Sequence, residues 1–154
     1  MTTYVIPQLA PIYAALGPWV EALLRVVVAL CLIPHGLRTY YGMFPDTGMP
    51  VNSTKMLSEV LDAEGFPPGW LWAPVIIVTE LILAPMLALG LFTRVVSIPI
   101  FILLTLSIVA HSKFGWFWNK QGCEYPLVWA AASLYFLVNG GGQISLDRLI
   151  GWEF

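Results

Sequence analysis

The sequence is poor in charged residues. Asp, Glu, Lys and Arg make up 10% of its 154 residues, whereas an ordinary soluble domain contains about 25%. Hydrophobic residues make up 58%, so the composition excludes an ordinary soluble domain and indicates an integral membrane protein. The apolar runs show no strict alternation of polar and apolar residues, which predicts membrane-spanning helices rather than a β-barrel.

Clusters of basic residues are also missing. The 7 Lys and Arg residues are scattered and the formal net charge is −2, so no nucleic-acid-binding surface is expected. Residues 1–18 contain no Lys or Arg and therefore lack the charged start of a secretory signal. We expect no cleavage there.

Motifs that hold redox cofactors are absent as well. The chain has 2 cysteines, no CxxC or CxxCH motif and no glycine-rich nucleotide loop, so no intrinsic cofactor is expected. Cys31 falls inside the first long apolar run and Cys123 at the start of the last. Because their depths differ, we expect no disulfide between them. Any redox centre would have to belong to another polypeptide.

Four apolar runs indicate membrane spans. The sequence predicts an all-α fold, an integral membrane bundle of four transmembrane helices that forms a single domain over residues 1–154. The main extramembrane loop is predicted at residues 43–70. Within it, Asn52 or Ser53 can cap a short amphipathic helix that continues to Ala63. The predicted spans are residues 19–41, 72–92, 95–111 and 126–139.

Three segments outside the spans are predicted contact surfaces. Residues 1–18 are apolar but contain prolines that argue against a regular span, so we expect them in the membrane interface or against another subunit. The loop 43–70 and the aromatic connector 113–125 are the other two surfaces. The predicted partners are therefore membrane lipid and other membrane-protein subunits.

The first span carries ionisable residues on one side. Four of them fall within an arc of about 140° when viewed down the helix: Glu21, Arg25, His35 and Arg38. A charge at the centre of a membrane helix costs at least ~2.5–3.5 kcal/mol on insertion scales, so such residues pair or mark a site. We predict two structural ion pairs on the side that holds the termini, Glu21 with Arg25 and Arg94 with Asp147.

A second group of ionisable residues is predicted on the opposite side of the bundle. Four antiparallel spans place the ends of spans one and three beside the starts of spans two and four. Glu80 lies well inside the second span without a charged neighbour in its own helix, so it must be neutral or find a partner on another span. This far-side cluster consists of His35, Arg38, Glu80, His111 and Glu124.

The residue types of the far-side cluster leave several interpretations open. The cluster could be a polar network that fixes helix register, with His35 paired to Glu80 and Arg38 to Glu124. His35 and His111 could ligate a haem, and all members except Arg38 are possible metal ligands, but without tight local spacing, so no metal site is predicted. We favour a quinone or another polar-headed lipophile, because His and a protonatable Glu at the end of an apolar cleft are suitable donors and acceptors.

Several short motifs occur together along the chain. They are Arg25, PHGLR at 34–38, Glu80, GLFTR at 90–94, His111, the G-x-E-x-P pattern at 122–126 and GGGQISLD at 140–147. In this order and spacing the chain resembles the DoxX family of small four-helix membrane proteins. The family usually has a lysine after the residue pair that corresponds to His35 and Gly36. Arg38 replaces this lysine here, which keeps the positive charge but stays protonated.

The resemblance implies a function only in outline. Related proteins include a subunit of thiosulfate:quinone oxidoreductase and membrane partners of redox enzymes. We therefore expect a DoxX-like membrane subunit of an oxidoreductase or electron-transfer complex that contributes to a quinone site. The alternative is a non-catalytic subunit of a photosynthetic or respiratory membrane complex. The resemblance also implies a multi-pass protein of a bacterial or archaeal cell membrane, with both termini in the cytoplasm.

Overall fold

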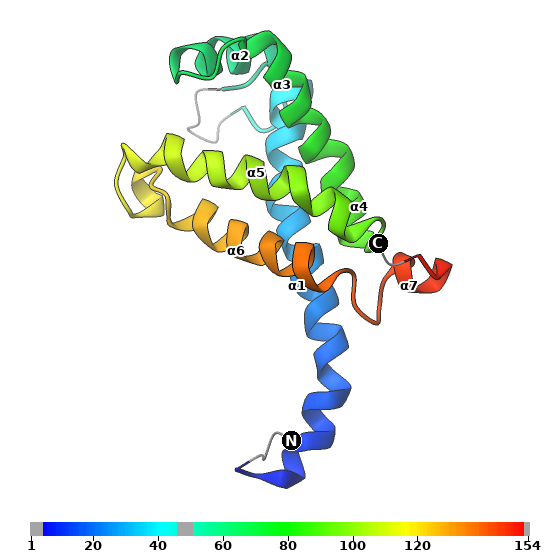
Figure 1. Ribbon diagram of the computed structural model, residues 1–154. Helices are drawn as coiled ribbons and strands as arrows, with labels where there is room; N and C mark the ends of the chain where they lie inside the picture. The colour runs from blue at the N-terminus through cyan, green and yellow to red at the C-terminus, as the bar shows by residue number, and fades with distance from the viewer. Residues whose placement is uncertain (1–4, 46–50, 153–154) are drawn as a thin grey trace.

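The computed structural model describes residues 5–45 and 51–152, and in these ranges the chain forms helices and no strands, which confirms the predicted all-α fold (Figure 1). The α-helices are α1 (Ala10–Tyr41), α2 (Thr54–Ala63), α3 (Gly69–Val78), α4 (Ala84–Leu89), α5 (Thr93–Ser112), α6 (Glu124–Asn139) and α7 (Leu146–Ile150). A π-helical turn, η2 (Thr79–Leu83), joins α3 to α4. Two short 3-10 helices are η1 (Pro7–Leu9) and η3 (Trp118–Lys120).

Three helical segments of the described chain are long and apolar enough to cross a membrane. They are Pro7–Tyr41, Gly69–Leu89 and Thr93–Ser112, and they overlap the first three predicted spans. The fourth candidate, α6, has 16 residues, which corresponds to about 24 Å of helix against a hydrocarbon core of about 30 Å. A fourth span therefore stays a prediction.

The first helix is longer than the sequence indicated. We expected the prolines of residues 1–18 to argue against a regular span there, but α1 begins at Ala10 and continues through Pro18 within the apolar segment Pro7–Tyr41, so this expectation was wrong. A proline in the first turn of a helix is tolerated because the N–H it lacks has no partner there, and this applies to Pro11. The N-terminal part of α1 projects beyond the other helices (Figure 1).

The amphipathic helix predicted in the first loop is confirmed as α2. Ser53 caps it by accepting a hydrogen bond from the backbone N–H of Met56 (3.3 Å). At its other end, the Oδ1 atom of Asp62 accepts a hydrogen bond from the backbone N–H of Gly69 (2.7 Å), which fixes α2 against the start of α3. Glu64 also pairs with Lys113 after α5. Helix α2 and the start of the connector between α5 and α6 therefore lie on the same side of the bundle.

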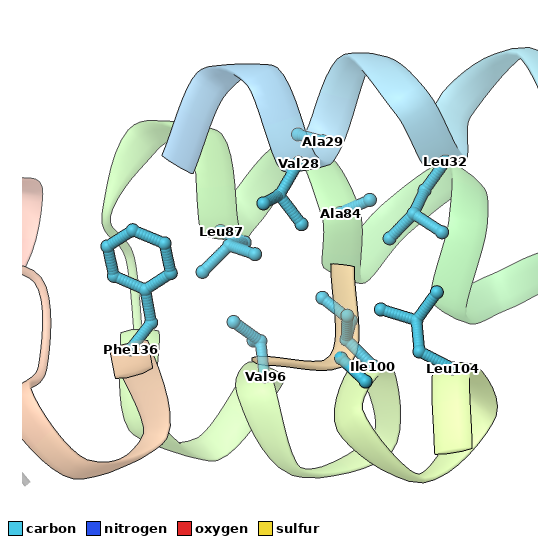
Figure 2. Packing of buried hydrophobic residues seen from close by; sticks show 10 residues of the cluster. Val28, Ala29, Leu32, Ala84, Leu87, Val96, Ile100, Leu104 and Phe136 are labelled. Atoms are coloured by element: carbon cyan, nitrogen blue, oxygen red, sulfur yellow. The ribbon is translucent and has the colours of Figure 1, made fainter. Parts of the chain in front are cut away.

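The hydrophobic core lies where α1, α4, α5 and α6 meet. Helices α5 and α6 lie side by side and run across α1 rather than alongside it (Figure 1). Figure 2 shows apolar side chains from all four helices filling the space between them. The labelled core residues are Val28, Ala29 and Leu32 of α1, Ala84 and Leu87 of α4, Val96, Ile100 and Leu104 of α5, and Phe136 of α6. This core holds polar residues at both of its ends.

Candidate functional site

Glu80 lies in the wide turn η2 of the second membrane helix. Glu80 is only 8% exposed, and its Oε2 atom has no hydrogen-bond partner within the described ranges. Pro85 accounts for the turn, because it has no N–H and its ring crowds the carbonyl four residues earlier. The N–H of Ala84 consequently donates to the carbonyl of Thr79, five residues back. π-helical turns of this kind are frequent at functional sites.

Gly36 brings α1 into direct contact with this turn. A Cβ atom at Gly36 would lie 2.9 Å from the Cβ of Glu80 and 2.7 Å from the Cγ of Leu81, so only glycine permits this approach. The neighbouring residue His35 is exposed on the surface of α1, and the structure records no hydrogen bond between His35 and Glu80. The two residues therefore come from touching segments without forming the pair considered from sequence.

Three members of the far-side cluster share one neighbourhood. His35 lies close enough to Arg38 and His111 for their charges to interact. Arg38 is buried at the end of α1, whereas His111 is half-buried near the end of α5. The Nδ1 atom of His111 lies 2.9 Å from the carbonyl oxygen of Ser107. This hydrogen bond orients the imidazole along its own helix.

Glu124 has a local role in the connector between α5 and α6. Its Oε1 atom accepts a hydrogen bond from the backbone N–H of Trp118 (2.7 Å), and its own N–H donates to the carbonyl of Trp116 (3.1 Å). A Cβ atom at Gly122 would lie 2.5 Å from the backbone of Trp116, so the connector also requires glycine here. These contacts close the connector into a compact loop, which accounts for the glycine and the glutamate of the G-x-E-x-P pattern. Among the described residues, no group of three or more potential ligands could hold a metal ion.

A second polar cluster, which we call the terminal-side cluster, was only partly anticipated. Its centre is Asp147, which is 5% exposed. The backbone N–H groups of Phe92 and Thr93 donate to its two carboxylate oxygens at 2.6 and 2.8 Å, and its own N–H donates to the carbonyl of Gly90 at 2.8 Å. Phe92 and Thr93 lie at the start of α5. Asp147 therefore accepts hydrogen bonds from the first N–H groups of this helix, as the side chain of an N-cap residue would.

Arg25 completes the terminal-side cluster from α1. It is 1% exposed, and its Nη2 atom donates to the carbonyl of Ile144. A Cβ atom at Gly90 would lie 1.7 Å from Nη1 of Arg25, and Gly90 has a φ of +68°, so two constraints require glycine at this turn. Glu21 and Asp147 both interact electrostatically with Arg25.

The two ion pairs predicted from the sequence are replaced by other contacts. Among the described residues the direct ion pairs join Lys55 to Glu59 and Lys113 to Glu64. Arg25 reaches past Glu21 to the backbone at Ile144, and Glu21 instead accepts a hydrogen bond from Tyr135 (3.1 Å). Asp147 binds backbone amides, and Arg94 lies against Gly140. In the sequence, the only indication of this arrangement was that the GLFTR and GGGQISLD motifs occur together in one chain.

Comparison with known proteins places the chain in a family. Neither a curated protein nor a solved structure matches it. The DoxX family model matches residues 20–113, which is more than half of the chain and includes Arg25, the segment around His35, Glu80 and the turn to Arg94. Together with the three apolar helices, this match identifies the chain as a multi-pass membrane protein that belongs to the DoxX family.

Proposed function

We propose that the protein is a membrane subunit of an oxidoreductase or electron-transfer complex, and that its far-side cluster contributes to a site for a quinone-like molecule. The observation that carries this proposal is Glu80, a buried carboxyl group with an unpartnered oxygen in the middle of a membrane helix. Intramembrane ionisable residues are expensive to bury and are typically functional. Glu80 takes part in none of the direct ion pairs of the described chain, so an ion pair between helices does not explain the presence of a carboxyl group at this position.

The chemistry of these residues suits a molecule that exchanges protons. A carboxyl group can give or take a proton at the polar head of a quinone, and a neutral imidazole can do the same. His35 is exposed on α1, where it would face lipid or a partner, and it lies next to Gly36, which contacts Glu80. A lipophile that enters from the membrane would therefore meet His35 first. Arg38 and His111, which interact electrostatically with His35, supply further donors.

The electrons must come from a partner, because the sequence has no motif for a redox centre of its own. We propose that partner subunits bind through residues 1–18, 43–70 and 113–125. We place the protein in the inner membrane of a bacterial or archaeal cell, with both termini in the cytoplasm.

The alternative proposal is a non-catalytic subunit that fills a gap in a larger photosynthetic or respiratory complex. The connector 113–125 favours it, because its aromatic side chains are exposed and Glu124 is used to hold its backbone. The exposed aromatic residues of this connector are Phe114, Trp116, Phe117, Trp118 and Tyr125. In this case deletion of residues 1–18 would release the subunit, while the turnover of each assembled complex stays normal.

Purification in mild detergent, followed by substitution of Glu80, tests the first proposal. We expect quinone or partner polypeptides to co-purify with the wild-type protein. The Glu80→Gln variant keeps the volume and a hydrogen-bonding head but loses the exchangeable acid. It should assemble normally and lose quinone-linked turnover. Full turnover in Glu80→Gln would remove this residue from the proposed site, and full turnover in both Glu80→Gln and His35→Gln would sink the proposal.

A further inference from the structure

The N-terminal third of α1 is longer than the membrane and the bundle require. Glu21 packs on Gly142, in the loop that follows α6, so the terminal-side end of the bundle lies at the level of Glu21. Residues 21–41 of α1 form about 30 Å of helix, which matches the hydrocarbon core of a bilayer. The exposed Trp19 then lies among the lipid headgroups, where tryptophans concentrate. Residues 10–18, which project beyond the other helices in Figure 1, therefore lie on the water side of the headgroups.

This projecting segment requires a partner to cover it. It contains no Asp, Glu, Lys or Arg, and its larger apolar side chains are exposed, with Leu16 at 52%. A helix that is hydrophobic on all sides is normally buried in protein or in lipid. Because residues 10–18 lie beyond the lipid, another polypeptide must cover them.

The exposed face of α1 carries a heptad repeat, which indicates what kind of polypeptide this is. In a coiled coil the repeat is lettered a to g, and the a and d residues make the contact. Leucine at d with a β-branched residue at a favours two parallel strands. In α1 and the residue before it, the d positions are Leu9, Leu16, Leu23 and Leu30, and the a positions are Tyr13, Val20 and Val27. We call these seven residues the heptad seam.

The heptad seam points away from the protein's own core. At 100° per residue it lies about 180° around α1 from the buried residues Val28, Ala29 and Leu32. Leu23 and Leu30 are each 61% exposed. The bundle therefore leaves this face of α1 free along its length, from the projecting segment into the membrane.

A second copy of this chain fits the heptad seam. Two copies inserted in the same orientation present parallel α1 helices of equal length, and a two-fold axis along the membrane normal brings the same residues together. The flanking e and g positions carry no charge, so two copies meet without like-charge repulsion. Between Leu9 and Val27 these positions are Ala10, Ile12, Gly17, Trp19, Leu24 and Val26.

The area of the seam is sufficient for a specific contact. Its exposed side chains are Tyr13, Leu16, Val20, Leu23 and Leu30. At about 100 Å² for each side chain, their burial on both copies removes about 1,000 Å² of apolar surface, the lower bound for a specific interface. The prolines Pro11 and Pro18 both fall at f positions, outside the contact.

We propose that the protein forms a parallel homodimer in which the two α1 helices pair along the heptad seam. This inference extends the proposed function, which places partner contacts in residues 1–18, by naming a second copy as the partner of the part that belongs to α1. It does not depend on a quinone site. The seam lies on the side of α1 opposite to Gly36, so the dimer leaves Glu80 and its surroundings uncovered.

Disulfide cross-linking in native membranes tests the register of the dimer. In a background of Cys31→Ser and Cys123→Ser, Leu16→Cys and Val20→Cys should give a linked dimer on mild oxidation. Ala14→Cys is the matched control, because Ala14 is exposed at a similar height on the opposite face of α1, and it should stay monomeric. Equal cross-linking at 14 and 16, none at any position, or a link from Leu16→Cys to a different polypeptide would each overturn the proposal.

The mass of the full-length protein in mild detergent tests the contact itself. Light scattering should give twice the 17.1 kDa of one chain for the wild type and for Ala14→Lys. Leu16→Lys places two like charges opposite each other in the seam and should shift the mass to one chain, with an unchanged melting temperature for the core. A dimeric Leu16→Lys protein would refute the seam. Glu80→Gln should remain dimeric, so loss of the dimer and loss of quinone-linked turnover are measured separately.

Discussion

Asp147 accepts a hydrogen bond from the backbone N–H of Thr93 at 2.8 Å, across 54 positions of sequence. The C-terminal segment thereby caps the helix that begins after the GLFTR turn. Helix N-termini leave four N–H groups without intrahelical partners, and no side chain at the start of α5 caps them locally. The segment that contains Asp147 is therefore part of the bundle and supplies a contact that α5 lacks.

The first prediction concerns this cap. Asp147→Ala leaves the N–H groups of Phe92 and Thr93 without acceptors in a buried place, so we expect a loss of about 1–3 kcal/mol in the free energy of unfolding. Thermal unfolding of the purified protein in detergent measures this loss. Glu59→Gln on the exposed face of α2 is the control and should stay within about 0.5 kcal/mol of the wild type. An unchanged melting temperature for Asp147→Ala would contradict the role of the cap.

The second prediction compares two glycines. Gly90→Ala places a methyl group on the guanidinium of Arg25 and forces a residue with a Cβ to keep a φ of +68°. The backbone conformation alone costs about 1–2 kcal/mol, and the displacement of Arg25 adds to it. Gly17→Ala, which faces open space within α1, should be neutral or stabilising by about 0.5–1 kcal/mol. Equal melting temperatures for the two variants would refute the contact.

A third prediction separates two carboxylates by their partners. Glu80→Leu removes a carboxyl group whose Oε2 has no partner, so the variant should be at least as stable as the wild type. Glu124→Leu removes the acceptor of the Trp118 N–H and should loosen the connector. Limited proteolysis between α5 and α6 measures the second effect and unfolding in detergent the first. A strongly destabilised Glu80→Leu protein would mean that Glu80 has a structural role.

The fourth prediction tests membrane orientation. The proposed orientation, with both termini in the cytoplasm, predicts that the loop that contains α2 faces outward. A cysteine at position 59, in a background of Cys31→Ser and Cys123→Ser, should react with an impermeant maleimide added to intact cells. Glu59 suits this test because its side chain is exposed, whereas Asp62 is engaged by the N–H of Gly69. Labelling that requires cell lysis would reverse the orientation.

Much of the fold could be predicted from the sequence because the signals were local. The apolar runs fixed the positions of three membrane helices to within a few residues, apart from the start of α1. Ser53 and the apolar stripe after it predicted α2, since a cap and helical periodicity both act within a few turns. The motifs from Arg25 to Asp147 indicated the family, and the match over residues 20–113 confirmed it.

The partners of the polar residues were decided by the tertiary structure. The spacing of Glu21 and Arg25 predicted an ion pair within one turn of helix, but the glycine at position 90 leaves room for Arg25 to reach the backbone of the C-terminal segment. Asp147 likewise binds the amides of α5 rather than Arg94. Sequence alone determined which helices form and which carry charge. Close packing at glycines determined which side chains meet, because a contact between distant segments depends on the space that each leaves open.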